Sequence, residues 1–304
     1  MTEPHPQAAP AVVHETPAPL PGKGSRSGLL KKLNPVNLFK KETPERFVRL
    51  GETLLEQKNF AQATIAFNRA LSLDKECADA YAGLGDCLAK KGGRVNMQNA
   101  LELYEQAILR NPFDEDVYVY RAKIFDAMGK RKEATLERKK MVVVKTLTTD
   151  PRNAVANNNM GILLLRNNQT EAAIEYFRKS VETDPSYEVA YRNLATVYFN
   201  LSKAAGDEAK KKELLEQAQV HITKALELLK SIPTLLVAAR VLMANGENEP
   251  ALELVTQAEA QDPAHKDVFG LKKLLLERLN RMEEARQAYA SYRMFSSGKM
   301  PDDL

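Results

Sequence analysis

The sequence predicts an all-α fold in which helix-turn-helix units stack side by side along an array. Three observations support this prediction. Apolar residues recur at helical spacing from Thr43 onward, an alanine motif returns at intervals near 34 residues, and small residues and prolines keep a steady phase relative to it. In such an array each unit buries little surface alone and is stabilised mainly by its neighbours.

The composition fits a protein that can bury a core. The chain has 304 residues, of which 44% are hydrophobic and 28% charged, with a net charge of +4. Basic and acidic residues are mixed along most of the chain, so we expect no nucleic-acid partner. No apolar run approaches the roughly 20 residues of a membrane-spanning helix, and no secretory signal is recognisable. We expect a cytoplasmic protein, which could also lie at the membrane surface.

The first 43 residues differ from the rest. Residues 1–28 are rich in Pro, Ala, Gly and Ser and are expected to form a disordered tail. Residues 29–43 read LLKKLNPVNLFKKET, and residues 23–41 contain six basic residues and no acid. This segment could be a tether or a cap on the first unit, contact an anionic membrane weakly, or dock on a protein. Its candidate docking residues are Lys31, Lys32, Leu38, Phe39, Lys40 and Lys41.

From Thr43 the repeat motif is an alanine, a large side chain four residues later and, in most copies, a small residue seven later. Its clearest copies are Ala63–Phe67–Ala70, Ala100–Tyr104–Ala107, Ala173–Phe177–Ser180 and Ala285–Tyr289, and weaker copies begin at Ala134, Ala218 and Ala251. A second small residue precedes the motif, twelve residues earlier in regular copies: Gly51, Gly85, Ala122, Gly161, Ala195 and Ala239. Turns are expected five residues before the alanine, where Gly and Asn tolerate positive φ: Lys58, Gly129, Asn168, Gly246 and Asn280.

This pattern resembles the tetratricopeptide repeat. Tyr81-x-x-Leu84-Gly85 and Tyr191-x-x-Leu194-Ala195 match the family's aromatic-x-x-Leu-small signature, and Asp-Pro pairs close several units. The resemblance implies a right-handed α-solenoid of about seven repeats over residues 44–297, followed by a tail at 298–304. The expected units are near 44–77, 78–114, 115–153, 154–187, 188–231, 232–265 and 266–297. Departures from the family pattern are Lys75 for Pro, Arg138 for an aromatic and Lys273 for a small residue.

One interval is lengthened by a charged insert, SKAAGDEAKKKELLEQ at residues 202–217. Its composition favours helix, so we expect it to extend both helices of the fifth unit into a projecting hairpin. Such a hairpin is either a solvated spur or a contact element for a partner.

No motif of catalytic, metal-binding or phosphate-binding type is recognisable. The four histidines, His5, His14, His221 and His265, are scattered, and Gly92-Gly93 opens no strand-to-helix unit. We therefore expect no enzyme, cofactor, metal or small-molecule substrate.

The resemblance implies that the first helix of each unit lines the concave side of the array. Asparagine there offers a donor and an acceptor to a peptide backbone, arginine can bind a carboxylate, and Ile162 and Phe199 provide an apolar floor. Asn157 falls on the packing face, where the family prefers an aromatic, so it should either weaken the packing or bond to a neighbour. An ordinary polar helix face is the alternative. The candidate groove residues are Asn158, Asn159, Ile162, Arg166, Arg192, Asn193, Phe199 and Asn200.

These observations favour a non-enzymatic scaffold or adaptor that holds a partner's peptide or helix in the groove. The alternative is a structural or peripheral-membrane assembly subunit that binds through its convex face, the 202–217 insert and the basic N-terminal segment. A weaker alternative is the regulatory subunit of an enzyme complex. The two-carboxylate clamp of some family members is not expected, because its positions hold Val48, Glu52, Gly83, Asp116 and Tyr120.

Overall fold

The computed structural model describes residues 42–297. The expected tails at 1–28 and 298–304, and residues 29–41 of the basic segment, lie outside the described residues. Fourteen helices and no strand make up the described part. They pair into seven units, which are α1 (Pro44–Glu56) with α2 (Phe60–Leu73), α3 (Ala78–Lys91) with α4 (Arg94–Arg110), α5 (Glu115–Ala127) with α6 (Arg131–Thr149), α7 (Ala154–Arg166) with α8 (Thr170–Thr183), α9 (Glu188–Ala204) with α10 (Glu208–Leu228), α11 (Ile232–Ala244) with α12 (Asn248–Gln261), and α13 (Lys266–Arg278) with α14 (Met282–Ser297).

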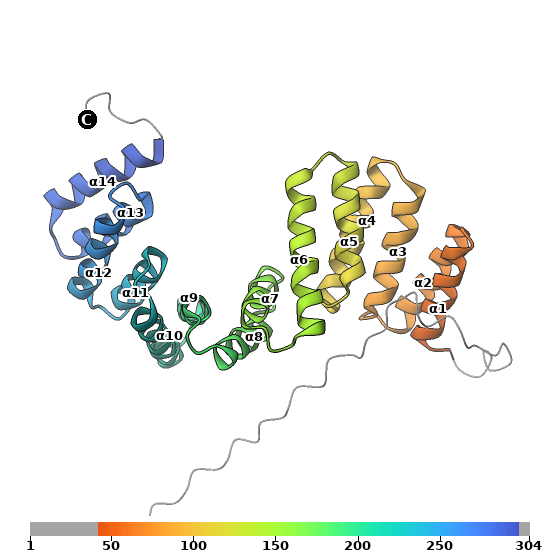
Figure 1. Cartoon of the computed structure of the whole chain (residues 1–304), viewed down its shortest axis with the longest axis horizontal. Coiled ribbons are helices and arrows are strands. Elements are labelled where there is room, and N and C mark those ends of the chain that lie inside the picture. Colours follow the sequence, from red (N-terminus) through yellow and green to blue (C-terminus); the bar gives the residue numbers. More distant parts are fainter. Residues whose placement is uncertain (1–41, 298–304) are drawn as a thin grey trace, which may run out of the picture.

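The units follow one another along a curved array (Figure 1). Each unit's second helix packs against the first helix of the next unit. In Figure 1, α7, α9 and α11 lie on the inner side of the curve, and α8, α10 and α12 lie on its outer side. The predicted solenoid of about seven repeats is therefore confirmed.

Side-chain caps and left-handed turn residues set the helix ends. The side chains of Thr43, Asn59, Asn153 and Asp207 accept backbone N–H groups at the starts of their helices, which satisfies donors that lack an intrahelical partner. All five predicted turn residues have positive φ: Lys58, Gly129, Asn168, Gly246 and Asn280. The turn positions read from the repeat are therefore confirmed.

An aromatic ring packed against a glycine joins the helices. A Cβ added at Gly51 would lie 2.6 Å from Phe67 Cε1, and one at Gly83 in the next unit would lie still closer to the same ring. The Phe67 ring therefore fills the space between α1, α2 and α3, and only hydrogen on the glycines leaves room for it.

The small position and the large position of the repeat vary together from unit to unit. Three units combine glycine with an aromatic: Gly51 with Phe67, Gly85 with Tyr104, and Gly161 with Phe177. Three combine alanine with a side chain that is not aromatic: Ala122 with Arg138, Ala195 with Ile222, and Ala239 with Val255. Where the first helix of a unit carries alanine instead of glycine, the second helix therefore lacks the aromatic ring.

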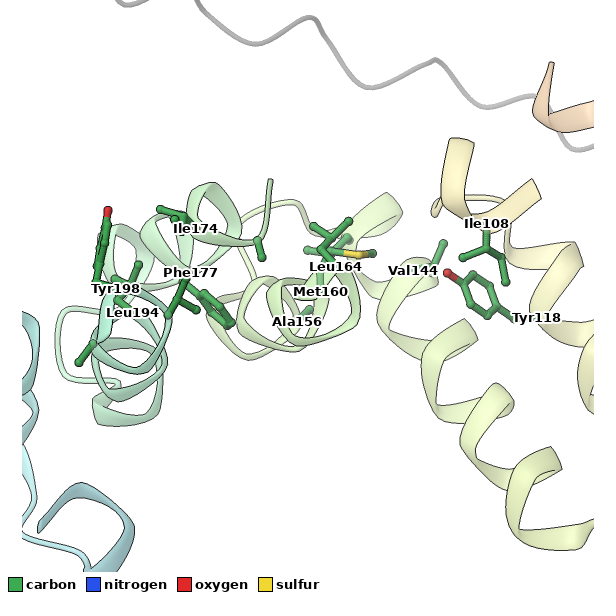
Figure 2. Packing of buried hydrophobic residues seen from close by; sticks show 14 of the residues in the cluster. Ile108, Tyr118, Val144, Ala156, Met160, Leu164, Ile174, Phe177, Leu194 and Tyr198 are labelled. Atoms are coloured by element: carbon green, nitrogen blue, oxygen red, sulfur yellow. The ribbon is translucent and has the colours of Figure 1, made fainter. Parts of the chain in front are cut away.

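The buried side chains form a continuous core through the middle units. One cluster extends from Ala82 in α3 to Val241 in α11. Figure 2 shows its members pointing into the spaces between successive helices, with the Phe177 ring between α7 and Leu194 of α9. Phe177 and Leu194 are both fully buried. Stacking of the units is therefore the main source of buried apolar surface.

The third unit departs from this packing. Arg138, at the expected aromatic position, is exposed and pairs with Asp126. Glu137 is buried instead, with Arg121 Nε 3.2 Å from its Oε2 and Lys140 Nζ 2.7 Å from its Oε1. An ion pair thus replaces the ring that three other units place here.

The charged insert lengthens the fifth unit. Helix α9 has 17 residues and α10 has 21, whereas α1 and α7 have 13. The connection between α9 and α10 lies at Ala205–Asp207, and most side chains beside it are exposed. Both helices are therefore extended, as the sequence predicts.

Gly161→Ala should lower the free energy of unfolding by about 1–3 kcal/mol, because the new methyl group overlaps the buried Phe177 ring. A Cβ at Gly161 would lie 2.6 Å from Phe177 Cε1. Urea denaturation measures the loss. The double variant Gly161→Ala/Phe177→Ile, which reproduces the Ala195–Ile222 combination, should recover stability relative to the sum of the single changes. Gly206→Ala, in open space, is the control and should be neutral; additive losses would contradict the size rule.

A half-buried histidine lies at the junction of units four and five. The His221 ring on α10 stacks on Tyr198 of α9, with ring centroids 5.6 Å apart. Arg178 Nη2 on α8 donates a 2.8 Å hydrogen bond to the Tyr198 hydroxyl. Burial, and secondarily the positive charge of Arg178, lower the pKa of His221 below its ordinary value of 6.5. The folded protein therefore favours the neutral imidazole.

Because the unfolded chain binds this proton more readily, the His221 contribution to stability is present above pH 6.5 and is lost as pH falls towards the lowered folded-state pKa. Urea denaturation at about pH 7.5 and about pH 5.5 measures the effect. Wild type should lose more stability between the two conditions than His221→Phe, which keeps an aromatic ring without the proton. Equal losses would show that His221 does not contribute.

Candidate functional site

A small pocket opens between units four and five. Its volume is about 220 Å³, and its lining comes from α7, α8 and α9. Apolar side chains and amide or hydroxyl groups share the lining, so the pocket combines a floor for an apolar group with polar atoms at its edge. The lining residues are Ile162, Leu165, Thr170, Phe177, Asn193, Thr196, Val197, Asn200 and Leu201.

The consecutive asparagines of α7 have separate roles. Asn157 is buried, and its Nδ2 donates to the carbonyl oxygens of Pro151 and Asn153, each at 2.9 Å. In the preceding unit the Tyr118 hydroxyl donates to Pro112 across the same six-residue separation. Asn157 therefore keeps this bond to the preceding proline without the tyrosine ring, in agreement with its predicted packing role.

Asn158 is buried and not part of the open groove. Only 1% of its surface is exposed, and its Oδ1 accepts a 2.7 Å hydrogen bond from Asn193 Nδ2. The expectation that its amide faces a peptide is therefore wrong. The neighbouring unit covers this position, and the amide joins α7 to α9. Asn159 beside it is half-buried, with its Oδ1 3.5 Å from Asn158 Nδ2.

Arg192 is largely committed to a contact inside the protein. Its Nη1 lies 3.3 Å from Oε1 of Glu188, whose side chain is 7% exposed. Thr234 of α11 also donates a hydrogen bond to Glu188. Burial of the carboxylate is compensated by these partners, which connect units five and six. A partner's carboxylate would therefore have to compete with Glu188 for Arg192, which was predicted to bind it.

The other candidates lie at or beside the pocket. Ile162, Asn193 and Asn200 line it directly. Arg166 is exposed and forms no ion pair with any other residue in 42–297. Phe199 is half-buried, and the Lys203 ammonium lies 5.4 Å from its ring centroid.

Several lining residues were not predicted as site residues. Phe177 was identified only as a packing aromatic, and Thr170, Val197 and Leu201 carry no motif of their own. Phe177 faces both Gly161 and the pocket, so packing and lining roles coincide in one ring. Position relative to the repeat, rather than residue type, is the signal that could have revealed them.

Asn158→Ala should destabilise the protein by about 1–3 kcal/mol, because the Asn193 amide loses its acceptor in a half-buried place. Thermal or urea denaturation measures this change. Asn200→Ala, at an exposed position that lines the pocket, should change stability by less than about 0.5 kcal/mol. Comparable stabilities of the two variants would show that the bond between Asn158 and Asn193 is not structural.

No helix within residues 42–297 is long and apolar enough to cross a membrane. No group of three or more His, Cys, Asp or Glu side chains in this range is arranged to hold a metal ion.

Family models support the repeat architecture. One model of the tetratricopeptide repeat matches residues 48–114 and 236–299, and a second matches residues 154–187. Together the matches cover more than half of the chain. The chain belongs to the tetratricopeptide repeat family. Membership supports a general role in protein–protein interaction, which is typical of these modules.

A curated relative and two solved structures show how far the similarity extends. Small glutamine-rich tetratricopeptide repeat-containing protein 2 of Mycosarcoma maydis is 30% identical over 110 residues, which are 36% of this chain and 30% of that protein. The chain thus aligns with less than a third of the relative's length.

PilF of Pseudomonas aeruginosa is 17% identical over 84% of this chain and 97% of its own, with a TM-score of 0.33. YrrB, described as having an unusual peptide-binding site, is 19% identical over 68% of this chain and 98% of its own, with a TM-score of 0.36. Neither likeness identifies a ligand of this chain.

Proposed function

We propose that this repeat protein is a non-enzymatic scaffold that holds an extended peptide, or one face of a helix, on the inner side of α7 and α9. The pocket between these helices is the observation that carries the proposal. At about 220 Å³ it is smaller than the pockets that enclose drug-sized molecules, and it suits one apolar side chain.

The polar lining suits the backbone on either side of that side chain. Asn200 is exposed and Asn193 is half-buried, so their amides border the pocket where a bound chain would pass. An amide group both donates and accepts, which matches the N–H and C=O groups of a peptide. Ile162 and Leu165 supply the apolar floor.

Arg166 adds a positive charge one helical turn from Ile162. It is exposed and forms no ion pair elsewhere in the described chain, so it remains available to a carboxylate. The proposed site therefore keeps six of the candidates, which are Asn159, Ile162, Arg166, Asn193, Phe199 and Asn200. Asn158 and Arg192 contribute only through their bonds to other residues of the protein.

A displayed library of random peptides, selected on the full-length protein, provides the test. Selected peptides should bind wild type and lose at least about tenfold in affinity for Ile162→Ala/Asn200→Ala, because both changes remove contacts at the pocket. Fluorescence polarisation with the synthetic peptides measures the affinities.

Ile65→Ala/Asn68→Ala is the matched control. It changes the same two residue types, both exposed on α2, the second helix of unit one. Binding should be unaffected by this pair. Peptides that bind the pocket variant and wild type equally would overturn the proposed groove.

A further inference from the structure

On the side that the repeat predicts to face inward, the first helices of units one to three carry a different charge from those of units four to six. On the first helix of a unit, the positions six before, one after and five after the close-approach residue form one stripe, since seven residues make nearly two turns. On α1, α3 and α5 these stripes hold the acids Glu45, Glu52, Glu56, Asp79, Asp86 and Asp116. They hold two lysines, Lys90 and Lys123.

The equivalent stripes on α7, α9 and α11 contain no acid. They contain two arginines, Arg166 and Arg240, among apolar and neutral polar residues. The inner face is therefore acidic towards the N-terminal end of the array and mildly basic in the middle. A basic ligand is attracted to the first region and not to the second.

The three acidic stripes adjoin. Helix α1 packs against α3, and α3 packs against α5. Glu45, Glu56 and Asp79 are exposed, and Glu52 is half-buried. At the +4 position of α1 and α3, the half-buried Leu55 and Ala89 place apolar surface beside the acids. The face thus offers negative charge together with apolar contacts.

The chain itself contains a segment of matching chemistry. Residues 23–41 carry six basic residues and no acid, with the apolar pairs Leu29-Leu30 and Leu38-Phe39. The segment joins the described chain at Glu42, two residues before α1 begins, and Glu42 pairs with Arg69 of α2 at 2.5 Å. About six extended residues span the roughly 20 Å length of α1, so the segment is long enough to cover the acidic face.

We propose that residues 23–41 bind in cis to the acidic inner face of α1, α3 and α5. This goes beyond the proposed peptide groove, because it occupies different units and uses the opposite charge. A short tether gives an effective concentration of about 1 mM, so a contact with a free-peptide Kd near 0.1 mM is already mostly formed within the intact chain. The segment therefore competes with any basic ligand for the first three units.

A labelled synthetic peptide of residues 23–41 tests the proposal. The receptor is the full-length chain in which the segment is neutralised by Lys31→Gln, Lys32→Gln, Lys40→Gln and Lys41→Gln. Fluorescence polarisation should show saturable binding that weakens as NaCl rises from about 0.05 M to about 0.5 M. Wild-type chain should bind the peptide several-fold more weakly, because its own segment already covers the face.

Two charge variants of this receptor locate the contact. Glu56→Lys/Asp79→Lys changes two exposed acids of the inner stripes and should lose most of the binding. Glu102→Lys/Glu105→Lys makes the same charge change at two exposed positions of α4, the second helix of unit two, and should retain it. Circular dichroism confirms that both variants are folded.

Three results would overturn the proposal: no saturable binding, equal binding by the two charge variants, or equal binding by wild type and the neutralised receptor. Vesicles of phosphatidylcholine with about 30% phosphatidylserine form a parallel arm. If the peptide binds these vesicles and does not bind the protein, the segment is a membrane-surface contact instead, and the proposal is overturned.

Discussion

The contact between a large side chain and a small residue determines how close the helices of this array can lie. Phe67 fills the space that Gly51 and Gly83 leave open, so one ring fixes the distances within a unit and to the next unit. Close packing leaves no spare volume there, so rings occur with glycine, whereas Ala195 and Ala239 occur with the smaller Ile222 and Val255. The spacing of successive helices therefore depends on this contact wherever it occurs.

The third unit shows what happens when this contact is absent. Without a ring, its interior holds Glu137 between Arg121 and Lys140. Arg121 precedes Ala122 at the position where Leu84 and Leu194 are buried in other units. A buried ion pair must repay the cost of removing both charges from water, so it contributes less than apolar packing of similar volume. The acidic and the basic stretches of the inner face meet beside this unit.

The repeat made the fold and its turns predictable, because each unit provides an independent copy of the same signal. Single side chains were less predictable. The repeat predicts that Asn158 faces the groove, but Asn193 of the next unit covers it across a separation of 35 residues. Positions about one period apart become neighbours in a stacked array, so such pairs can be sought in the sequence once the period is known. The contact of Glu188 with Thr234 cannot be found from the regular period, because the charged insert lengthens the separation to 46 residues.

The proposed functions use the array in complementary ways. A pocket for one side chain supplies only a small part of the affinity of a typical complex, so an extended ligand must contact several units to bind tightly. The reversal of charge along the inner face then gives the ligand a direction. A chain with acidic residues at one end and basic residues at the other matches the face in one orientation and meets like charges in the other, which is how electrostatic complementarity sets register. Cis binding of residues 23–41 would leave units four to seven open, and would thereby favour ligands that suit the pocket and Arg166.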